Sequence, residues 1–483
     1  MGREEQITGE RLRKIKELRD LGIEPYGYSF DKKQNAQECA ESKINSKVKT
    51  AGRIMTKRDL GKITFANLRD ESGEVQIVLQ DEETSKEQMN FFSKYVDSGD
   101  IVGVEGKIIK TKTGQISILI KNTELLSKSI KPLPEKFHGL KDEEEKYRKR
   151  YLDLLINPEV KKVFLIRNKM MNAMREFMEK NNFVEIETPL LQNCYGGACA
   201  SPFITHCNAF NSDVYLSIAP ELYLKKALVG GFDRVYEITK KFRNEGVDKF
   251  HNPEHMTIEW YQGYADYNEG MEMVKEFMKH LVKKIYGKYT FEYQGNKIDV
   301  SKWETLTLEE AIKKYLKEDI SKIRTDVDAK KMAKKHGIEE QGITKSNIAD
   351  ELMKLFREKL IQPTFLIDYP IELAPLAKPK RGDPTKAEIF QPFIGGMEIA
   401  RAYSELNDPV LQAKHFKEQE EERKKGNEEA MPTDKDFVDA LEHGMPPACG
   451  VGFGIERLVM LLTDSNSIRN VLTFPFMKSE GAK

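Results

Sequence analysis

The sequence lacks several features that would exclude or favour whole classes of protein. Its five cysteines form no Cys-x-x-Cys pair, so we interpret them as reduced thiols of a cytoplasmic protein without a zinc site. No apolar stretch resembles a signal peptide or a membrane-spanning helix, and we therefore expect no membrane partner. The 78 basic residues balance the 78 acidic ones, so net charge neither favours nor excludes nucleic acid, although a local basic face could bind it.

The 483 residues are enough for two or three domains. The composition, with 39% hydrophobic and 32% charged residues, is typical of a soluble globular protein. Shifts in pattern divide the chain into four parts. We predict a helical extension (1–46), a small β-barrel domain (47–130), a linker (131–159) and a larger domain (160–483) with a lysine-rich helical insertion at about 305–360. Apolar residues at helical spacing in residues 3–22 predict a helix. It could be a docking helix, a basic arm or a solvated helix, and we favour the solvated helix.

The second part has the pattern of an OB-type barrel, a fold that binds single-stranded nucleic acid through aromatic and basic side chains. Phe65 follows Arg58 and Lys62, so it is either a stacking platform for a base or a core residue, and the pattern leaves both open. The predicted strands are Val48–Ile54, Thr64–Arg69, Val75–Leu79, Asp100–Ile109 and Gln115–Ile120, with a helix at Ser85–Tyr95 after the third.

The larger domain alternates helical and strand patterns. The predicted strands are Phe183–Pro189, Val235–Ile238 and Thr257–Tyr261, and the predicted helices are Phe164–Asn181, Glu269–Tyr286 and Lys417–Glu429.

A polar loop joins two of these strands and contains Phe242-Arg243-Asn244-Glu245-Gly246, followed by His251. It offers a guanidinium for phosphate oxygens, a carboxylate that could accept from an amino group, and an imidazole. The alternative is a hairpin that carries only a surface ion pair.

A glycine-rich stretch, Gly450–Leu458, places glycine at alternate positions before Arg457 opens an apolar helix. Glycine in a strand allows close approach of another group, and an arginine at a helix start adds a cation for phosphate. Together with Arg243, it indicates two arginines that grip one polyphosphate. The spacing is not that of a P-loop or a dinucleotide-binding fingerprint.

Carboxylates and phenols recur in a third group of stretches. In a strand, Tyr403 and Glu405 would share one face, as would Glu259 and Tyr261, and Glu221 adds a third carboxylate. Such a pocket suits a cationic ligand, because a buried ammonium must be paired. The alternatives are a metal site or surface acids. Glu398 is the candidate ligand for Mg²⁺, which often lies between carboxylate and phosphate oxygens.

On these residues the chain resembles the class II lysyl-tRNA synthetases over nearly its whole length. Phe183–Leu191 is similar to motif 1 of the class, Phe242–Glu245 with His251 to motif 2, and Gly450–Arg457 to motif 3. Ala219–Tyr223 and Tyr403–Pro409 are similar to stretches specific for the lysine family.

The resemblance implies an α+β protein: an N-terminal OB-fold barrel that binds the anticodon, and a class II antiparallel sheet flanked by helices, in a homodimer. It implies an ATP-dependent ligase that converts L-lysine and ATP into lysyl-adenylate and pyrophosphate, with Mg²⁺, and then transfers lysine to the 3′ end of tRNA(Lys). Such chemistry needs positioning and charge neutralisation, so we name no general base.

The resemblance also implies a role for each matching residue. Arg243 and Arg457 would be the catalytic residues, and Glu398 the metal ligand. The ATP site would comprise Arg243, Glu245, His251, Asn252, His255, Glu398 and Arg457. The lysine site would comprise Gly197, Glu221, Arg243, Glu259, Tyr261, Tyr403, Glu405 and Gly452. The anticodon site would comprise Arg58, Phe65, Gln76 and Glu124.

Four positions depart from the family pattern. His255 stands where phenylalanine is usual beside adenine, and Gln391 where a second magnesium-binding carboxylate is usual. Arg401 replaces an asparagine, and Ser201 an arginine. A cation at position 401 would repel an ammonium ligand unless it turns to a phosphate or a carboxylate.

Three alternative functions have to be weighed. Another class IIb synthetase, for aspartate or asparagine, is the nearest alternative, and Glu221, Glu259 and Glu405 argue against an aspartate pocket, which would need cations. A paralogue that attaches lysine to a protein would generally lack the barrel. A non-catalytic tRNA-binding or regulatory protein would not need Arg243 and Arg457.

Overall fold

The structure is a computed structural model that describes residues 2–134, 140, 142–424, 430–479 and 481. The chain forms two compact units, Met1–Gly139 and Leu140–Lys483. Each unit is described below by itself. Among the described residues, the structure has no helix long and apolar enough to cross a membrane.

The first unit contains the barrel expected from the sequence. Its strands are β1 (Lys47–Asp59), β2 (Ile63–Arg69), β3 (Glu74–Gln80), β4 (Ile101–Lys110) and β5 (Ile116–Ser127), and α3 (Lys86–Tyr95) lies between β3 and β4. They close in the order β1-β2-β3-β5-β4. Along β2, Thr64, Ala66 and Leu68 point into the barrel, as the period of two requires. The OB-type prediction is confirmed.

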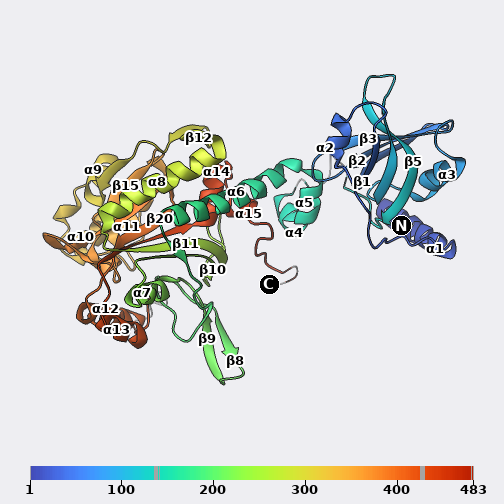
Figure 1. The fold of residues 1–483 in the computed structure, drawn as a ribbon. Coiled ribbons are helices and arrows are strands. Elements are labelled where there is room, and N and C mark those ends of the chain that lie inside the picture. The colour runs from blue at the N-terminus through green and yellow to red at the C-terminus, as the bar shows by residue number, and fades with distance from the viewer. Residues whose placement is uncertain (1, 135–139, 141, 425–429, 480, 482–483) are drawn as a thin grey trace. The chain divides into compact units, whose positions relative to one another are not determined.

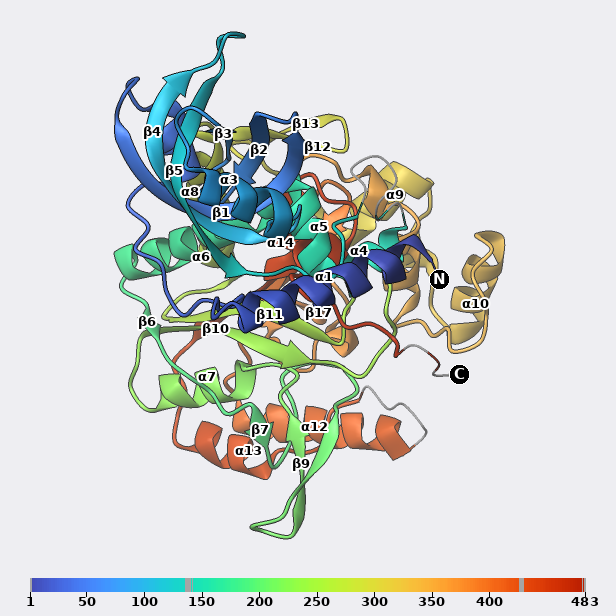
Figure 2. The same cartoon turned by 90° about the vertical axis from the view of Figure 1, so that its right-hand side faces the viewer.

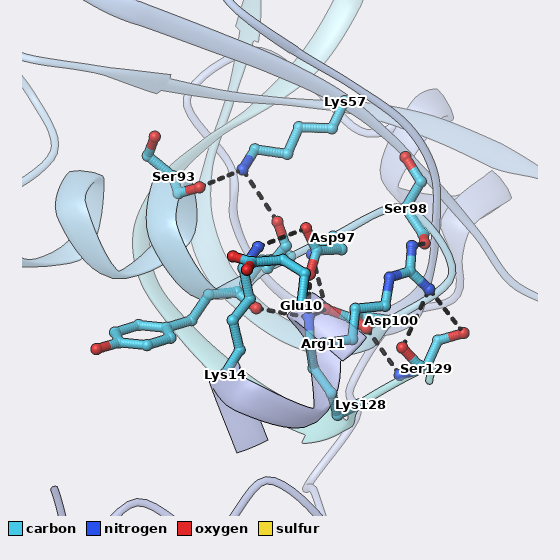
Figure 3. Close-up of polar contacts among 12 residues, drawn as sticks. Glu10, Arg11, Lys14, Lys57, Ser93, Asp97, Ser98, Asp100, Lys128 and Ser129 are labelled. Carbon is cyan, nitrogen blue, oxygen red and sulfur yellow. Dashed lines mark hydrogen bonds and ion pairs between the residues drawn. The ribbon is translucent and has the colours of Figure 1, made fainter. Parts of the chain in front are cut away.

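The N-terminal helix α1 (Arg3–Asp20) packs against the barrel, so its interpretation as a solvated helix was wrong. Ile15 and Leu18 are buried. The Arg11 guanidinium donates to the carbonyl oxygen of Ser98 at 2.7 Å (Figure 3). It also donates to the carbonyl oxygen of Lys131 at 2.8 Å. The sequence pattern did not reveal this contact because the helix buries an arginine rather than a broad apolar face. The same unit contains α2 (Ala36–Glu41).

A buried lysine lies under this helix. The Lys128 ammonium pairs with Asp97 and, at 2.7 Å, with Asp100, and Lys14 of α1 reaches Asp97 at 2.8 Å (Figure 3). Because a buried charge is tolerated only when it is paired, this network fixes the position of α1 on the barrel.

The second unit is built on one large sheet. Its strands are β6 (Val184–Glu185), β10 (Arg234–Phe242), β11 (Glu254–Gly263), β14 (Glu304–Thr307), β15 (Thr364–Ile367), β18 (Ile389–Ile394), β19 (Met397–Glu398), β20 (Ala400–Ser404) and β21 (Ala448–Gly454). The order is β14-β15-β18-β20-β21-β11-β10-β6, with β19 paired to β18. Only the edge pairs β6–β10 and β14–β15 are parallel among these described strands.

Three helices cover one face of the sheet. These are α6 (Pro158–Lys180), α8 (Tyr267–Tyr286) and α14 (Ile455–Leu462), and α6 and α8 run side by side (Figures 1 and 2). Their apolar residues form the main core with the sheet, where Trp260 stacks on Phe453 at a ring distance of 5.4 Å. The other face is therefore free to carry polar side chains. The α+β prediction of a largely antiparallel sheet flanked by helices is confirmed.

The remaining elements surround this sheet. The helices are α4 (Glu143–Arg148), α5 (Arg150–Ile156), α7 (Glu221–Val229), α9 (Leu308–Leu316), α10 (Asp326–Lys335), α11 (Ile348–Lys354), α12 (Pro409–Lys424), α13 (Lys435–Glu442) and α15 (Ile468–Val471). The small strands are β7 (Leu191–Gln192), β8 (Ile204–Cys207), β9 (Ser212–Leu216), β12 (Thr290–Tyr293), β13 (Asn296–Asp299), β16 (Pro379–Lys380) and β17 (Asp383–Ala387). Short 3-10 turns lie at η1 (Ile320–Lys322), η2 (Arg357–Lys359) and η3 (Ile371–Leu373).

Several element boundaries differ from the sequence predictions. The strand predicted at Phe183–Pro189 is only the two-residue β6. Ile186 N–H still donates to the Tyr236 carbonyl, but Thr188 N–H donates to the Glu237 carboxylate at 2.9 Å, so the ladder ends before Pro189. The helix predicted at Lys417–Glu429 begins at Pro409 and is described to Lys424, and residues 425–429 lie outside the described part. Residues 305–360 are mostly helical but begin within strand β14.

Candidate active site

The centre of the site is the row of strands β11, β21 and β20. Their register aligns Glu259, Gly452 and Arg401 in one row across the sheet. A second row, two residues further along the strands, contains Tyr261, Gly450 and Tyr403. Glycine in the middle strand leaves space above the sheet between the larger side chains of its neighbours. A cavity of about 350 Å³ lies here.

One end of the cavity, which we call the arginine half, is lined by Arg243, His251, Asn252, His255 and Arg457. Arg243 follows β10 directly, and Arg457 lies in the first turn of α14, as the sequence predicts. The Nε of Arg243 is buried and has no hydrogen-bond partner among the described residues. A guanidinium with an unused buried donor is what an anionic ligand would satisfy.

Arg457 and His251 hold each other in place in this half. Arg457 donates through Nη1 to the Glu398 carbonyl oxygen at 2.8 Å and through Nη2 to His251 Nε2 at 3.2 Å. Since Nε2 accepts, His251 carries its proton on Nδ1 and donates it to Asp248, 2.8 Å away. The loop does join a β10–β11 hairpin and carries the exposed His251–Asp248 pair, but it also contacts Arg457 in the cavity wall, so it is more than a hairpin with a surface ion pair.

His255 also lines the arginine half, and its pKa is lowered to about 3 by burial and by the neighbouring Arg243 and Arg457. The ring is neutral at physiological pH, so it offers a flat surface without adding charge. Glu245 lines the cavity and is exposed. The Oδ1 atom of Asn252 is buried, and no described residue donates to it.

The opposite end, the carboxylate half, is lined by Glu221, Glu259, Tyr261 and Tyr403. The Tyr403 hydroxyl lies 2.7 Å from both carboxylate oxygens of Glu221, and the Tyr261 hydroxyl donates to Glu259 at 2.6 Å. Burial, and then the charge of Glu221, raise the pKa of Glu259 to about 7. The carboxylate half is thus acidic and largely buried, and Glu259 is only partly ionised at neutral pH.

Glu405 takes a different place from the other acids. It is buried and is not among the residues that line the cavity, but it lies against Gly450, where an added Cβ would overlap its Oε1 atom. Its partner is Lys225, which the sequence interpretation missed. Lys225 is fully buried, pairs with Glu405 and lies 2.5 Å from Glu221. The only available sequence signal was its position four residues after Glu221 on one helix.

The wall beside Glu221 contains Gly197, whose φ of +84° and close approach to Glu221 both require glycine. Gly452 lies in the floor of the cavity. A Cβ added to it would lie 3.3 Å from the Oε2 atom of Glu259. Arg401 lines the cavity and donates to the Leu373 carbonyl oxygen at 2.8 Å. The partner in this contact is a backbone carbonyl oxygen, whereas the sequence led us to expect a phosphate or a carboxylate.

Glu398 lies in the cavity wall, whereas Gln391 is buried outside it and accepts a hydrogen bond from Tyr369 at 2.5 Å. Within the described residues, there is no group of three acidic, histidine or cysteine side chains that could hold a metal ion. A cation at Glu398 would therefore take most of its ligands from a bound molecule and water. The carbonyl oxygen of Ser201 accepts a hydrogen bond from the Asn244 N–H at 2.8 Å.

Comparison with known proteins identifies the family. The profile of the tRNA synthetases class II (D, K and N) matches residues 142–478. The chain belongs to this class II tRNA synthetase family. A second profile, of the OB-fold nucleic acid binding domain, matches residues 48–126.

Curated relatives of this class II synthetase match almost end to end. The lysine–tRNA ligase of Carboxydothermus hydrogenoformans is 46% identical over 98% of this chain and 98% of its own length. Those of Pelotomaculum thermopropionicum and Thermotoga maritima are 46% and 45% identical, over 99% and 98% of this chain and 96% of their own lengths in both cases.

The OB-fold of this class II synthetase carries the four residues predicted to contact an anticodon. Phe65 is half-buried outside the barrel core, opposite exposed Arg58 in the β1–β2 register, so the alternative of a core residue is wrong. Gln76 accepts a hydrogen bond from the Ser117 hydroxyl at 2.7 Å, and Glu124 is exposed. All four side chains are at least partly accessible on the outside of the barrel, but their contacts with RNA remain a prediction.

Proposed function

We propose that this chain is a lysine–tRNA ligase. It activates L-lysine with ATP to give lysyl-adenylate and pyrophosphate, and then transfers lysine to the 3′ end of tRNA(Lys). The observation that carries this proposal is one cavity with two arginines at one end and a cluster of carboxylates at the other. The near-full-length relatives named lysine–tRNA ligase support it.

The arginine half suits the triphosphate. Arg243, with its unused Nε donor, would hold the α-phosphate and the lysine carboxylate, and Arg457 with His251 would meet the outer phosphates. Glu245 would accept from the adenine amino group, and the neutral ring of His255 would stack on the base. The lysine carboxylate attacks the α-phosphorus, and pyrophosphate leaves with the charge that these cations stabilise.

The carboxylate half suits a ligand with two ammonium groups. Glu221 and Glu259, beside the backbone of Gly197, would surround the α-ammonium. Tyr261, Tyr403 and Glu405 would receive the side-chain ammonium, and Gly452 leaves room for the bound amino acid. An aspartate side chain would meet repulsion here, which argues against the aspartyl alternative.

Mg²⁺ fits this site with one protein carboxylate. Glu398 would hold it, because Mg²⁺ commonly takes one or two carboxylates and completes its shell with phosphates and water. Bound there, it would neutralise charge on the phosphates. Gln391 is buried and already bonded to Tyr369, so it is not a second ligand in this arrangement.

Two features of the assembly also belong to the proposal. The OB-fold would bind the anticodon through Arg58, Phe65, Gln76 and Glu124. The enzyme would act as a homodimer in the cytoplasm.

The test is ATP–pyrophosphate exchange with lysine, aspartate and asparagine in separate reactions, followed by charging of tRNA(Lys). We expect exchange with lysine alone. Exchange that depends on aspartate or asparagine would overturn the substrate assignment, and lysine-dependent exchange without tRNA charging would favour a paralogue that modifies another acceptor.

A further inference from the structure

Lys225 is a charged side chain with no role in the function proposed so far. It lies on α7 with 0% exposure, four residues after Glu221. Its ammonium lies 2.5 Å from Glu221 and forms an ion pair with Glu405. It therefore joins two of the three acids that the amino-acid site is expected to use.

The surroundings of this ammonium are dry and aromatic. The rings of Tyr261, Tyr403 and Phe437 lie with their centroids 5.9, 5.5 and 5.9 Å from Lys225 Nζ. Burial alone would lower the pKa of Lys225, but Glu221 and Glu405 outweigh it and hold the pKa above its usual value. Lys225 is thus a fixed positive charge inside the protein.

Glu405 uses only one of its two oxygens for this pair. The ion pair with Lys225 is made by Oε2. Both oxygens are buried and without a hydrogen-bond partner among the described residues, so Oε1 has neither a hydrogen bond nor this ion pair. Oε1 lies at Gly450, which lines the cavity. A buried carboxylate oxygen without a donor is costly unless a ligand supplies one.

Many groups that face Glu405 disfavour its charge. Burial raises the pKa of Glu405 well above its usual value, Lys225 opposes that shift, and Glu221 and Glu259 reinforce it. The phenols of Tyr261 and Tyr403 and the thiol of Cys449 are neutral neighbours whose own pKa values are raised, first by burial. Within the described residues, the cation that forms an ion pair with Glu405 is Lys225.

We propose that Lys225 is a positioning and specificity-determining residue: its ammonium is a permanent counter-ion that favours the ionised form of Glu405, so that Glu405 Oε1 accepts the side-chain ammonium of the amino-acid substrate. The charges agree with this role. When all three acids are ionised, Lys225 balances one of them and leaves two negative charges for the two ammonium groups of lysine. This inference rests on the proposed function and adds how the site separates lysine from uncharged amino acids.

The opposite role would be competition, in which Lys225 occupies the place of the substrate ammonium. One observation favours the counter-ion. Lys225 pairs with Oε2 of Glu405, whereas Oε1 is the oxygen that lies at Gly450 in the cavity lining.

The decisive variant is Lys225→Met, which keeps the length of the side chain and removes its charge. The matched control is Lys226→Met, at the neighbouring and more exposed lysine that pairs with Asp436. ATP–pyrophosphate exchange is measured with the full-length chain over a range of lysine concentrations. Binding of lysine and of norleucine, which has the same chain without the ammonium, is measured by calorimetry.

In Lys225→Met we expect the KM for lysine to rise roughly 10- to 100-fold, the usual effect of losing a hydrogen bond to a charged group, with kcat changed far less. The preference for lysine over norleucine should fall by a similar factor, because a protonated Glu405 no longer rewards an ammonium. The control should match the wild type in both measurements.

Two results would overturn the proposal. A lower KM in Lys225→Met would show that Lys225 competes with the substrate, and equal weakening of lysine and norleucine would show a structural role only. If Lys225→Met does not fold, as judged by its melting temperature, Lys225→Gln gives the same comparison with a neutral donor. Should the wild type itself show no lysine-dependent exchange, the proposed function fails instead, and the two failures are distinct.

Discussion

The two halves of the cavity prepare for ligand in opposite ways. In the arginine half, Arg243 keeps a buried donor without a partner, and Asn252 an acceptor. In the carboxylate half, Glu221 and Glu259 are already bonded to tyrosine hydroxyls. The arginine half leaves these buried atoms for a ligand, whereas in the carboxylate half tyrosine hydroxyls fix Glu221 and Glu259 in place and Oε1 of Glu405 is left for the ligand. We infer that the first half supplies binding and charge neutralisation, and the second supplies selectivity.

Removing Arg243 should have the largest effect. In Arg243→Ala, adenylation should fall by roughly 10²- to 10³-fold, about 2.7–4 kcal/mol, because a pre-positioned donor to the developing charge is lost. Lysine-dependent ATP–pyrophosphate exchange measures it, with Lys240→Ala as the control at an exposed cation paired with Glu254. Full activity in Arg243→Ala would contradict the role of the arginine half.

Adding one methyl group should break the carboxylate half alone. In Gly450→Ala, the new Cβ would overlap Glu405 and the Tyr261 ring, so the KM for lysine should rise by about 10-fold or more, in line with the cost of overpacking. Gly452→Ala is the comparison on the same strand: its Cβ would lie 3.3 Å from Glu259, and we expect a smaller loss. Titrating lysine and ATP separately decides the matter, since a KM for ATP that rises equally would mean that the halves are not independent.

The carboxylate half should also respond to pH. Because the pKa of Glu259 is raised to about 7, it is mostly protonated at pH 6 and mostly ionised at pH 8. A bound ammonium prefers the ionised form, so the KM for lysine should fall as pH rises, by about tenfold across this range. In Glu259→Gln this dependence should vanish. An unchanged slope in that variant would assign the titration to another group.

The smallest effect is expected at His255. Because its pKa is lowered to about 3, the ring is neutral and would act by stacking alone. His255→Phe should therefore change the KM for ATP by less than about threefold, within the range of aromatic contacts. A large rise would mean that the imidazole donates or accepts a hydrogen bond in the arginine half.

Local patterns predicted much of this molecule. The barrel strands and β10, β11 and α8 follow from period-two and helical spacing, and Arg457 lies in the first turn of its helix as expected. The burial of α1 could not be predicted in this way, because its anchor is Arg11, which binds carbonyl oxygens distant in the sequence. Lys225 was missed for the same reason, since burial makes it part of the site and its partner Glu405 is 180 residues away in the chain.

The position of Glu405 relative to the cavity could not be predicted from the sequence either. Alternation predicts that it shares a face with Tyr403, but it cannot show that Gly450 leaves a space which Glu405 fills from behind. Register across three strands, rather than along one, determines which acids line the cavity.

Two lysines, Lys128 in the first unit and Lys225 in the second, are each held between two carboxylates and almost inaccessible. Amine-reactive labelling followed by mass spectrometry should therefore modify exposed Lys240 at once and these two only after their own unit opens. The chain thus carries a separate built-in reporter of unfolding in each of its compact units.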